Sequence, residues 1–202
     1  MAFTIPPFAR DLIEHWWHAI CEAVDGLMDR LVPDGIVPAP RLPRAEVQAM
    51  TDALDLFEAM MRRMLILLAA QHGPAPAPAG ALQLVFRIDE CPPAPVLRNV
   101  RDTDPDFCLN PPPERALRSG DPPTDGLVST AGILRRVRAL IHLFDHGEAY
   151  MQAMRARFCA PQRPIPTLLP AAFTGPVITS SLRENLQTFH TLALDAQASN
   201  TS

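Results

Sequence analysis

The chain has 202 residues, of which 48% are hydrophobic, and a formal net charge of −4 at pH 7. This length suits one domain, or one domain with a long arm, and the hydrophobic content is sufficient for a core. The negative net charge gives no electrostatic basis for binding to nucleic acid or to an anionic membrane. All 18 basic residues are arginine, and together with the many alanines and prolines this composition indicates a GC-rich, bacterial genome.

The distribution of the 23 prolines predicts where helices form. Proline removes a backbone donor and clashes with the preceding helical turn, so a long helix needs a stretch without proline. Four windows contain none: residues 8–32, 44–73, 124–160 and 177–202. Apolar residues recur at helical spacing in each of them. The chain is therefore expected to consist of helical blocks joined by proline-rich connections.

The first two windows have the most regular apolar spacing. In the first, apolar residues recur at steps of three or four over residues 12–31, and acidic residues lie on the opposite face. In the second, an unbroken apolar seam extends over residues 47–68. Ile66 and Leu67 lie off this seam, so the end of the second helix is apolar on its other faces too. We expect other structure to surround this end.

A short strand is expected after the second helix. Leu82, Leu84, Phe86 and Ile88 alternate with mostly polar residues, and this period of two is typical of a half-buried strand. The stretch that follows, residues 91–125, has no periodicity and much proline. We expect it to form a long arm, either extended over the surface or disordered.

The third window predicts one helix, with an apolar seam over residues 133–158 in which Gly147 occupies the one position that lacks an apolar side chain. The last helix is expected to begin at Ser181, because Ser181 and Glu184 have the spacing of a capping box.

These elements predict a mainly α fold. We expect a small bundle of about four helices with a long proline-rich, largely irregular arm and at most one or two short strands. Residues 1–90 form an N-terminal helical pair with a short strand, and residues 91–125 form the arm. The C-terminal helices, within residues 126–202, pack on the N-terminal pair to complete one composite domain.

Histidines are the best candidates for chemistry. His142 and His146 are one helical turn apart, a spacing at which two histidines can share a metal ion. In the first helix, His15, His18 and Glu22 have spacings that also permit shared coordination. At about 100° per residue, however, both groups lie away from the apolar faces, whereas ligands inside a bundle point inward. The sequence therefore favours solvated histidines over a metal site and predicts no cofactor.

Three apolar residues are candidates for contact with a partner. Trp16 and Trp17 cannot both face the core of one straight helix, which leaves Trp17 at the edge of the apolar stripe as a potential binding anchor. A lid over a shallow core is the structural alternative for Trp17. Ile66 and Leu67 add apolar surface beyond what a small bundle covers, and this favours a homodimer, with burial inside the chain's own fold as the alternative.

Two hypotheses for function follow. The favoured one is a non-enzymatic helical protein that acts by protein–protein contact, as a scaffold or adaptor, on an unidentified protein or a second copy of the chain. The alternative is a metal-dependent helical-bundle enzyme or metal-binding protein that uses the histidines and carboxylates of the first and third helices. The sequence has no nucleophile elbow, phosphate-binding loop or dinucleotide-binding motif, which disfavours an enzyme. It also has no secretory signal, membrane-length apolar run or cysteine framework, so a cytoplasmic location without a membrane partner is expected.

Overall fold

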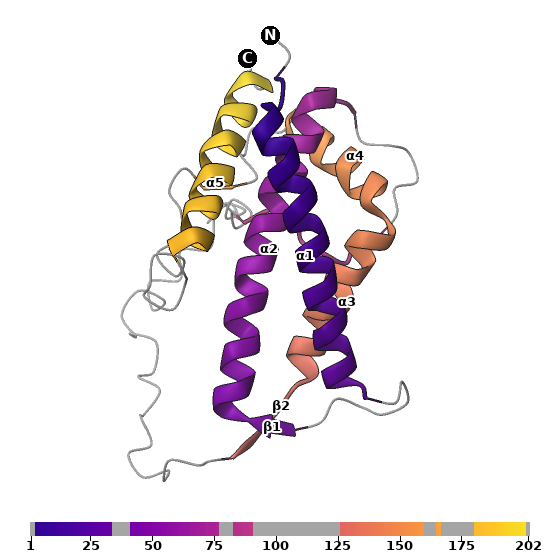
Figure 1. Cartoon of the computed structure of the whole chain (residues 1–202). Helices are drawn as coiled ribbons and strands as arrows, with labels where there is room; N and C mark the ends of the chain where they lie inside the picture. Colours follow the sequence, from indigo (N-terminus) through magenta and orange to yellow (C-terminus); the bar gives the residue numbers. More distant parts are fainter. Residues whose placement is uncertain are drawn as a thin grey trace, which may run out of the picture.

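The computed structural model describes residues 3–33, 41–76, 83–90, 126–159, 165–166 and 180–200. These residues form five α-helices and a two-stranded sheet (Figure 1). The prediction of a mainly α fold, a helical bundle with a few short strands, is confirmed. The arm predicted at residues 91–125 lies outside the described residues.

The helix boundaries follow the prolines. In chain order the elements are α1 (Pro7–Leu31), β1 (Arg41–Pro43), α2 (Arg44–His72), β2 (Leu127–Ser129), α3 (Ala131–Asp145), α4 (Gly147–Arg157) and α5 (Ser180–Asn200). Proline at the first position of α1 is compatible with a helix start, because the amide there has no partner within the helix. After α2, Gly73 has a φ of +72°, in the left-handed region that favours glycine.

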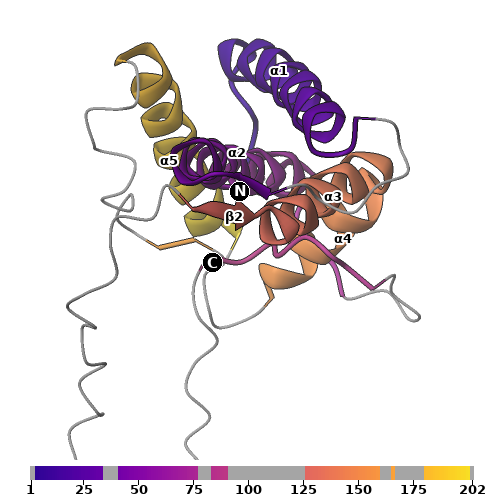
Figure 2. The same cartoon turned by 90° about the horizontal axis from the view of Figure 1, so that it is seen from below.

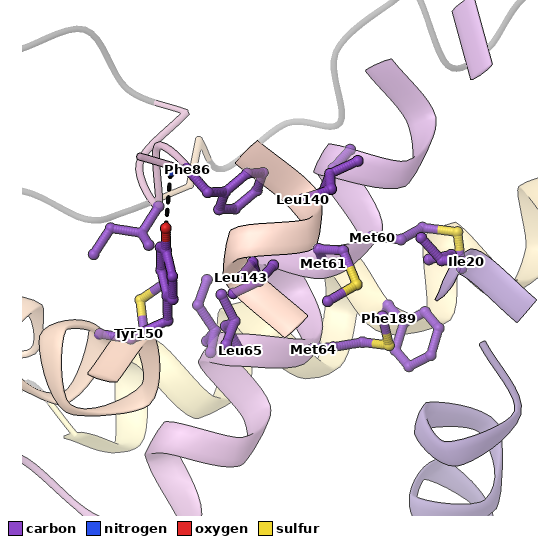
Figure 3. Packing of buried hydrophobic residues seen from close by; sticks show 14 of the residues in the cluster. Ile20, Met60, Met61, Met64, Leu65, Phe86, Leu140, Leu143, Tyr150 and Phe189 are labelled. Atoms are coloured by element: carbon purple, nitrogen blue, oxygen red, sulfur yellow. Dashed lines mark hydrogen bonds between the residues drawn. The ribbon is translucent and has the colours of Figure 1, made fainter. Parts of the chain in front are cut away.

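Helix α2 is the centre of the bundle and contacts each of the other four helices. Figure 2 shows it between α5 on one side and α3 with α4 on the other, while α1 lies across a third side. Over residues 59–70, every residue except Arg62 and Leu68 is buried. The methionines and leucines of this stretch pack against residues from all four neighbours (Figure 3): Met60, Met61, Met64 and Leu65 with Ile20, Leu140, Leu143, Tyr150 and Phe189. The sequence prediction that this end of the helix is surrounded is therefore confirmed.

The predicted seams form the core, with differences at two phenylalanines. Leu54, Met61, Val137 and Leu140 of these seams are buried, whereas Phe57 and Phe144 are partly buried and pack against the core. Phe144 is close to the end of α3, where its ring contacts Trp17 of α1 at the side of the bundle. A seam position near a helix end has fewer neighbours than one in the middle.

The strand predicted at Leu82–Ile88 is wrong. Its described part, residues 83–88, has no strand, and the sheet consists instead of β1 and β2, which pair antiparallel with Leu42 opposite Val128. The predicted alternation is nevertheless present, because Phe86 and Ile88 are buried. This segment lies against helices, and its burial pattern therefore arises from side-chain packing without a neighbouring strand. We refer to residues 83–90 as the strap.

The third predicted helix is two helices. α3 ends at Asp145 and α4 begins at Gly147, with His146 between them at φ −125° and ψ 31°. Glycine in a helix interior costs about 1 kcal/mol relative to alanine, so the position without an apolar side chain is also where the helix is weakest. The break turns α4 so that Tyr150 lies close to His142 on the preceding helix.

None of the helices in the described part of the chain is long and apolar enough to cross a membrane.

The packing around α2 predicts that two side-chain truncations differ strongly in their effect on the free energy of unfolding. Leu140→Ala removes a fully buried side chain and is expected to lower the free energy of unfolding by about 2–5 kcal/mol. Phe8→Ala removes a ring that is 58% exposed, and a change within about 0.5 kcal/mol is expected. Urea unfolding of both variants measures the difference. Equal costs would show that the core has been assigned to the wrong faces.

Candidate functional site

The structure does not bring the four candidate histidines together. His15 and His18 lie on the exposed face of α1, and the imidazole of His18 is 3.2 Å from the carboxylate of Glu22. His142 and His146 stack on each other at the end of α3, with ring centroids 4.3 Å apart. Among the described residues, no three histidine, cysteine, aspartate or glutamate side chains are close enough to hold a metal ion.

The sequence places His142 on the solvent side, and this is wrong. His142 is half-buried, and its Nδ1 is 2.8 Å from the Tyr150 hydroxyl. The reason is the break after α3, which the sequence does not predict and which positions the first turn of α4 against His142. The neighbouring His146 is exposed, as the periodicity predicts.

Tyr150 is the chain's one tyrosine and fastens the strap to the bundle. Its buried hydroxyl accepts hydrogen bonds from the backbone N–H groups of Phe86, at 2.9 Å (Figure 3), and Val85, at 3.1 Å. A hydroxyl has one proton and two acceptor lone pairs. With both lone pairs used by the strap, the hydroxyl donates its proton to Nδ1 of His142.

A buried ion pair holds the other end of the strap. The guanidinium of Arg63 has no exposed surface and donates to both carboxylate oxygens of Glu90, at 2.6 and 3.2 Å. Its remaining contacts are the Ala59 carbonyl, at 2.7 Å, and Nδ1 of His190 on α5, at 3.2 Å. Arg63 therefore connects α2, α5 and the strap through one planar group.

A second group of charges continues this network toward the surface. Arg62 donates to Glu58, and Glu58 also accepts from Arg136 of α3 at 2.7 Å. Burial lowers the pKa of Arg136, but hydrogen bonds and charge from Glu58 and Asp55 more than compensate, so its pKa is raised above the usual value. Asp55, Glu58 and Arg62 line a small charged pocket of about 330 Å³ together with residues of the strap. Because its carboxylates accept hydrogen bonds from arginines, we interpret this cluster as a structural contact that holds α2 and α3 together.

The larger hollow is a groove of about 830 Å³ beside the N-terminal half of α1. Residues of α1 and of the last turns of α2 line it, together with Ile5, which precedes α1. The lining residues are Ile5, Arg10, Ile13, Glu14, His15, Trp17, His18, Leu68 and Gln71. We call it the α1 groove.

The α1 groove exists because α3 is short. Phe144, next to the last residue of α3, contacts the Trp17 ring edge-on, with centroids 5.7 Å apart. The α1 residues that line the groove precede or flank this contact, and no α3 residue is among the lining. Beyond the end of α3, this side of α1 therefore faces the groove.

Of the three residues predicted to contact a partner, one lies on accessible surface. Trp17 is half-buried and lines the α1 groove. Ile66 and Leu67 are fully buried in the core of the chain itself, so contact with a partner through them would require the bundle to open. The reason is that α1, α3, α4 and α5 pack around α2.

Sequence reasoning did not identify Tyr150, Arg63 or Glu90 as structurally important. A signal was present for Arg63, because it lies in the apolar half of a helix, where a charged side chain needs a buried partner. For Tyr150 and Glu90 no local pattern exists, since each acts on residues far away in the sequence.

The Tyr150 hydroxyl makes a testable contribution to the order of the strap. Tyr150→Phe leaves the buried N–H of Phe86 and the part-buried N–H of Val85 without their acceptor, and a loss of about 1–3 kcal/mol in the free energy of unfolding is expected. Amide hydrogen exchange at these two residues should accelerate more than in the core of α2. Thr191→Val, which removes an exposed hydroxyl bonded within α5, is the control. Unchanged exchange in the strap would contradict this role.

Substitutions of Arg63 and Glu90 are expected to have non-additive effects on the free energy of unfolding. Glu90→Leu leaves the buried guanidinium uncompensated, and a cost of about 3–5 kcal/mol is expected. Replacing both residues, as in Arg63→Met with Glu90→Leu, should cost less than Glu90→Leu alone. Chemical unfolding of Arg63→Met, Glu90→Leu and the double variant tests this. Additive costs would show that the two side chains do not act as a pair.

The sequence matches no protein-family model, and no significant match was found among the curated proteins or among the solved structures.

Proposed function

We propose that this protein is a non-enzymatic helical protein that acts by contact with another protein, and that the α1 groove is its contact site. The observation that carries the proposal is the groove itself, with an apolar wall of Ile13, Trp17 and Leu68. Its exposed polar residues, among them Arg10 and Glu14, form a rim around that wall.

This arrangement has the anatomy of a protein-binding surface. Protein interfaces have an apolar centre surrounded by a polar rim, and tryptophan is enriched among the residues that contribute most to binding. Trp17 is positioned by its contact with Phe144 and keeps part of its ring accessible. A tryptophan held in this way can act as an anchor with little loss of side-chain entropy.

The charged residues of the interior support a structural scaffold. Arg63 connects α2 to the strap and Arg136 connects α3 to α2, each through a carboxylate, and both ion pairs are internal to the chain. The proposed compartment is the cytoplasm, in agreement with the free thiols of Cys21 and Cys159.

Affinity capture that depends on the groove tests this function. Tagged wild-type protein and a Trp17→Ala variant are used to capture proteins from the native lysate, with Phe8→Ala as the matched control outside the groove lining. Trp17→Ala is expected to reduce the captured partner by at least about tenfold, because such anchors dominate binding energy. Phe8→Ala should capture as wild type does, and circular dichroism confirms that both variants fold. The same proteins captured equally by all three forms would contradict the α1 groove as contact site.

A further inference from the structure

We propose that the α1 groove receives an amphipathic helix with a basic end from another protein. Its apolar side chains would enter the groove, and its arginines or lysines would lie over the carboxylates next to it. This inference rests on the proposed function and adds the chemistry of the partner.

The exposed face of α1 is acidic. The helix has five exposed carboxylates and two arginines. The carboxylates are Asp11, Glu14, Glu22, Asp25 and Asp29, and the arginines are Arg10 and Arg30. Arg30 is already paired with Glu46 of α2. Within the described part of the chain, Asp11, Glu14, Asp25 and Asp29 form no ion pair. The face therefore has a surplus of negative charge that its own neighbours leave uncompensated.

The groove lies between this acidic face and the core. At about 100° per residue, Ile13 and Trp17 fall on the side of α1 that borders the buried stripe, and Glu14 falls between them and the acidic face. Ile13 is buried, Trp17 is half-buried and Glu14 is exposed, which agrees with that order. A helix in the groove would thus have an apolar contact on one side and carboxylates on the other.

The acidic residues concentrate beyond Trp17. One helical turn after it, the Cys21 thiol is partly buried, and burial raises its pKa. Asp25, Asp145 and Glu22 raise it further, so all three carboxylates lie within electrostatic reach of one side chain. The opposite end of the groove carries Arg10. This charge gradient orients the partner, with its basic end toward Cys21.

The dimensions agree with a short helix. The stretch of α1 that lines the groove, Arg10 to His18, rises by about 12 Å at 1.5 Å per residue, which corresponds to two to three turns of a partner helix. Amphipathic helices dock in grooves of this kind through apolar residues spaced three or four positions apart.

The same charges disfavour a second copy of the chain as the occupant. If two copies paired through α1 about a twofold axis, the acidic faces would oppose each other, and like charges across an interface cost affinity. Ile66 and Leu67, the two residues that favoured a homodimer in the sequence, are buried within the chain. A basic helix avoids this repulsion, and its positive charges would balance the negative charge of the unpaired α1 carboxylates.

Two designed peptides test this inference on the full-length protein. Both are fluorescein-labelled helices of about four turns with the same leucine face. One has three arginines in its last turns and the other has glutamates at these positions. Fluorescence anisotropy gives each Kd in low and in high salt. The basic peptide is expected to bind at least about tenfold more tightly in low salt, and this difference should shrink in high salt because exposed charges are screened.

Three variants assign the binding to the groove. Trp17→Ala should weaken the basic peptide by about tenfold or more, because it removes the apolar anchor. Glu22→Gln combined with Asp25→Asn should reduce the preference for the basic peptide and retain the salt-independent part of its affinity. Asp195→Asn, which removes an exposed carboxylate on α5, is the charge control and should bind as wild type does.

The outcomes separate this inference from the proposed function. Equal or tighter binding of the glutamate peptide, or failure of both peptides to bind, overturns the basic partner. In that case the proposed contact function is tested only by whether capture from the lysate depends on Trp17. If Trp17→Ala leaves the Kd of the basic peptide unchanged, the peptide binds outside the groove and the inference is overturned. A mass above the 22.2 kDa of the monomer in light scattering, lost in Trp17→Ala, would identify a second copy as the occupant and also overturn it.

Discussion

The second half of α2 is apolar on every face, and no side of it can remain in water without a large cost. At roughly 25 cal/mol per Å² of apolar surface, burying this stretch is a strong driving force for packing helices around it. The bundle meets this requirement by placing α1, α3, α4 and α5 on different sides of one central helix. The methionines there, Met60, Met61 and Met64, contact these neighbours with flexible side chains that fill irregular gaps.

Arg63 is the buried charge within that stretch, and the strap is organised around it. A buried guanidinium requires a partner, and Glu90 supplies one with two hydrogen bonds. Nearer the other end of the strap, Tyr150 accepts from two backbone N–H groups, and that of Phe86 would otherwise be buried without an acceptor. The strap is thus fixed by polar contacts at both ends and by the burial of Phe86 and Ile88 between them. It has no strand partner, and side chains of the helices bond to its backbone: Tyr150 at Val85 and Phe86, and Arg62 at Arg87.

The break between α3 and α4 links the core to the surface that we assign to binding. Because α3 ends at Asp145, its last residues reach α1 only as far as Trp17 and Cys21. The α1 groove begins where this coverage ends. The break also places Tyr150 beside His142, so the same departure from a continuous helix produces both the strap contact and the open side of α1. A continuous helix over this region would have extended along α1 and left less of its side open.

The sequence by itself determined which four stretches are helical, though not the break between α3 and α4, which face of α1 is acidic and that the end of α2 is surrounded. These features depend on local rules, namely the steric effect of proline and the periodicity of apolar residues, and both act within a few turns of the chain. Only the tertiary structure decided that Arg63 pairs with Glu90, that Tyr150 holds the strap, that the alternating segment has no strand partner and that Trp17 lines a groove. Arg63 contacts residues 27 and 127 positions away, and Tyr150 contacts the strap across 64 and 65 positions. Contacts at such separations depend on how whole helices pack, and no pattern within one helix specifies that packing.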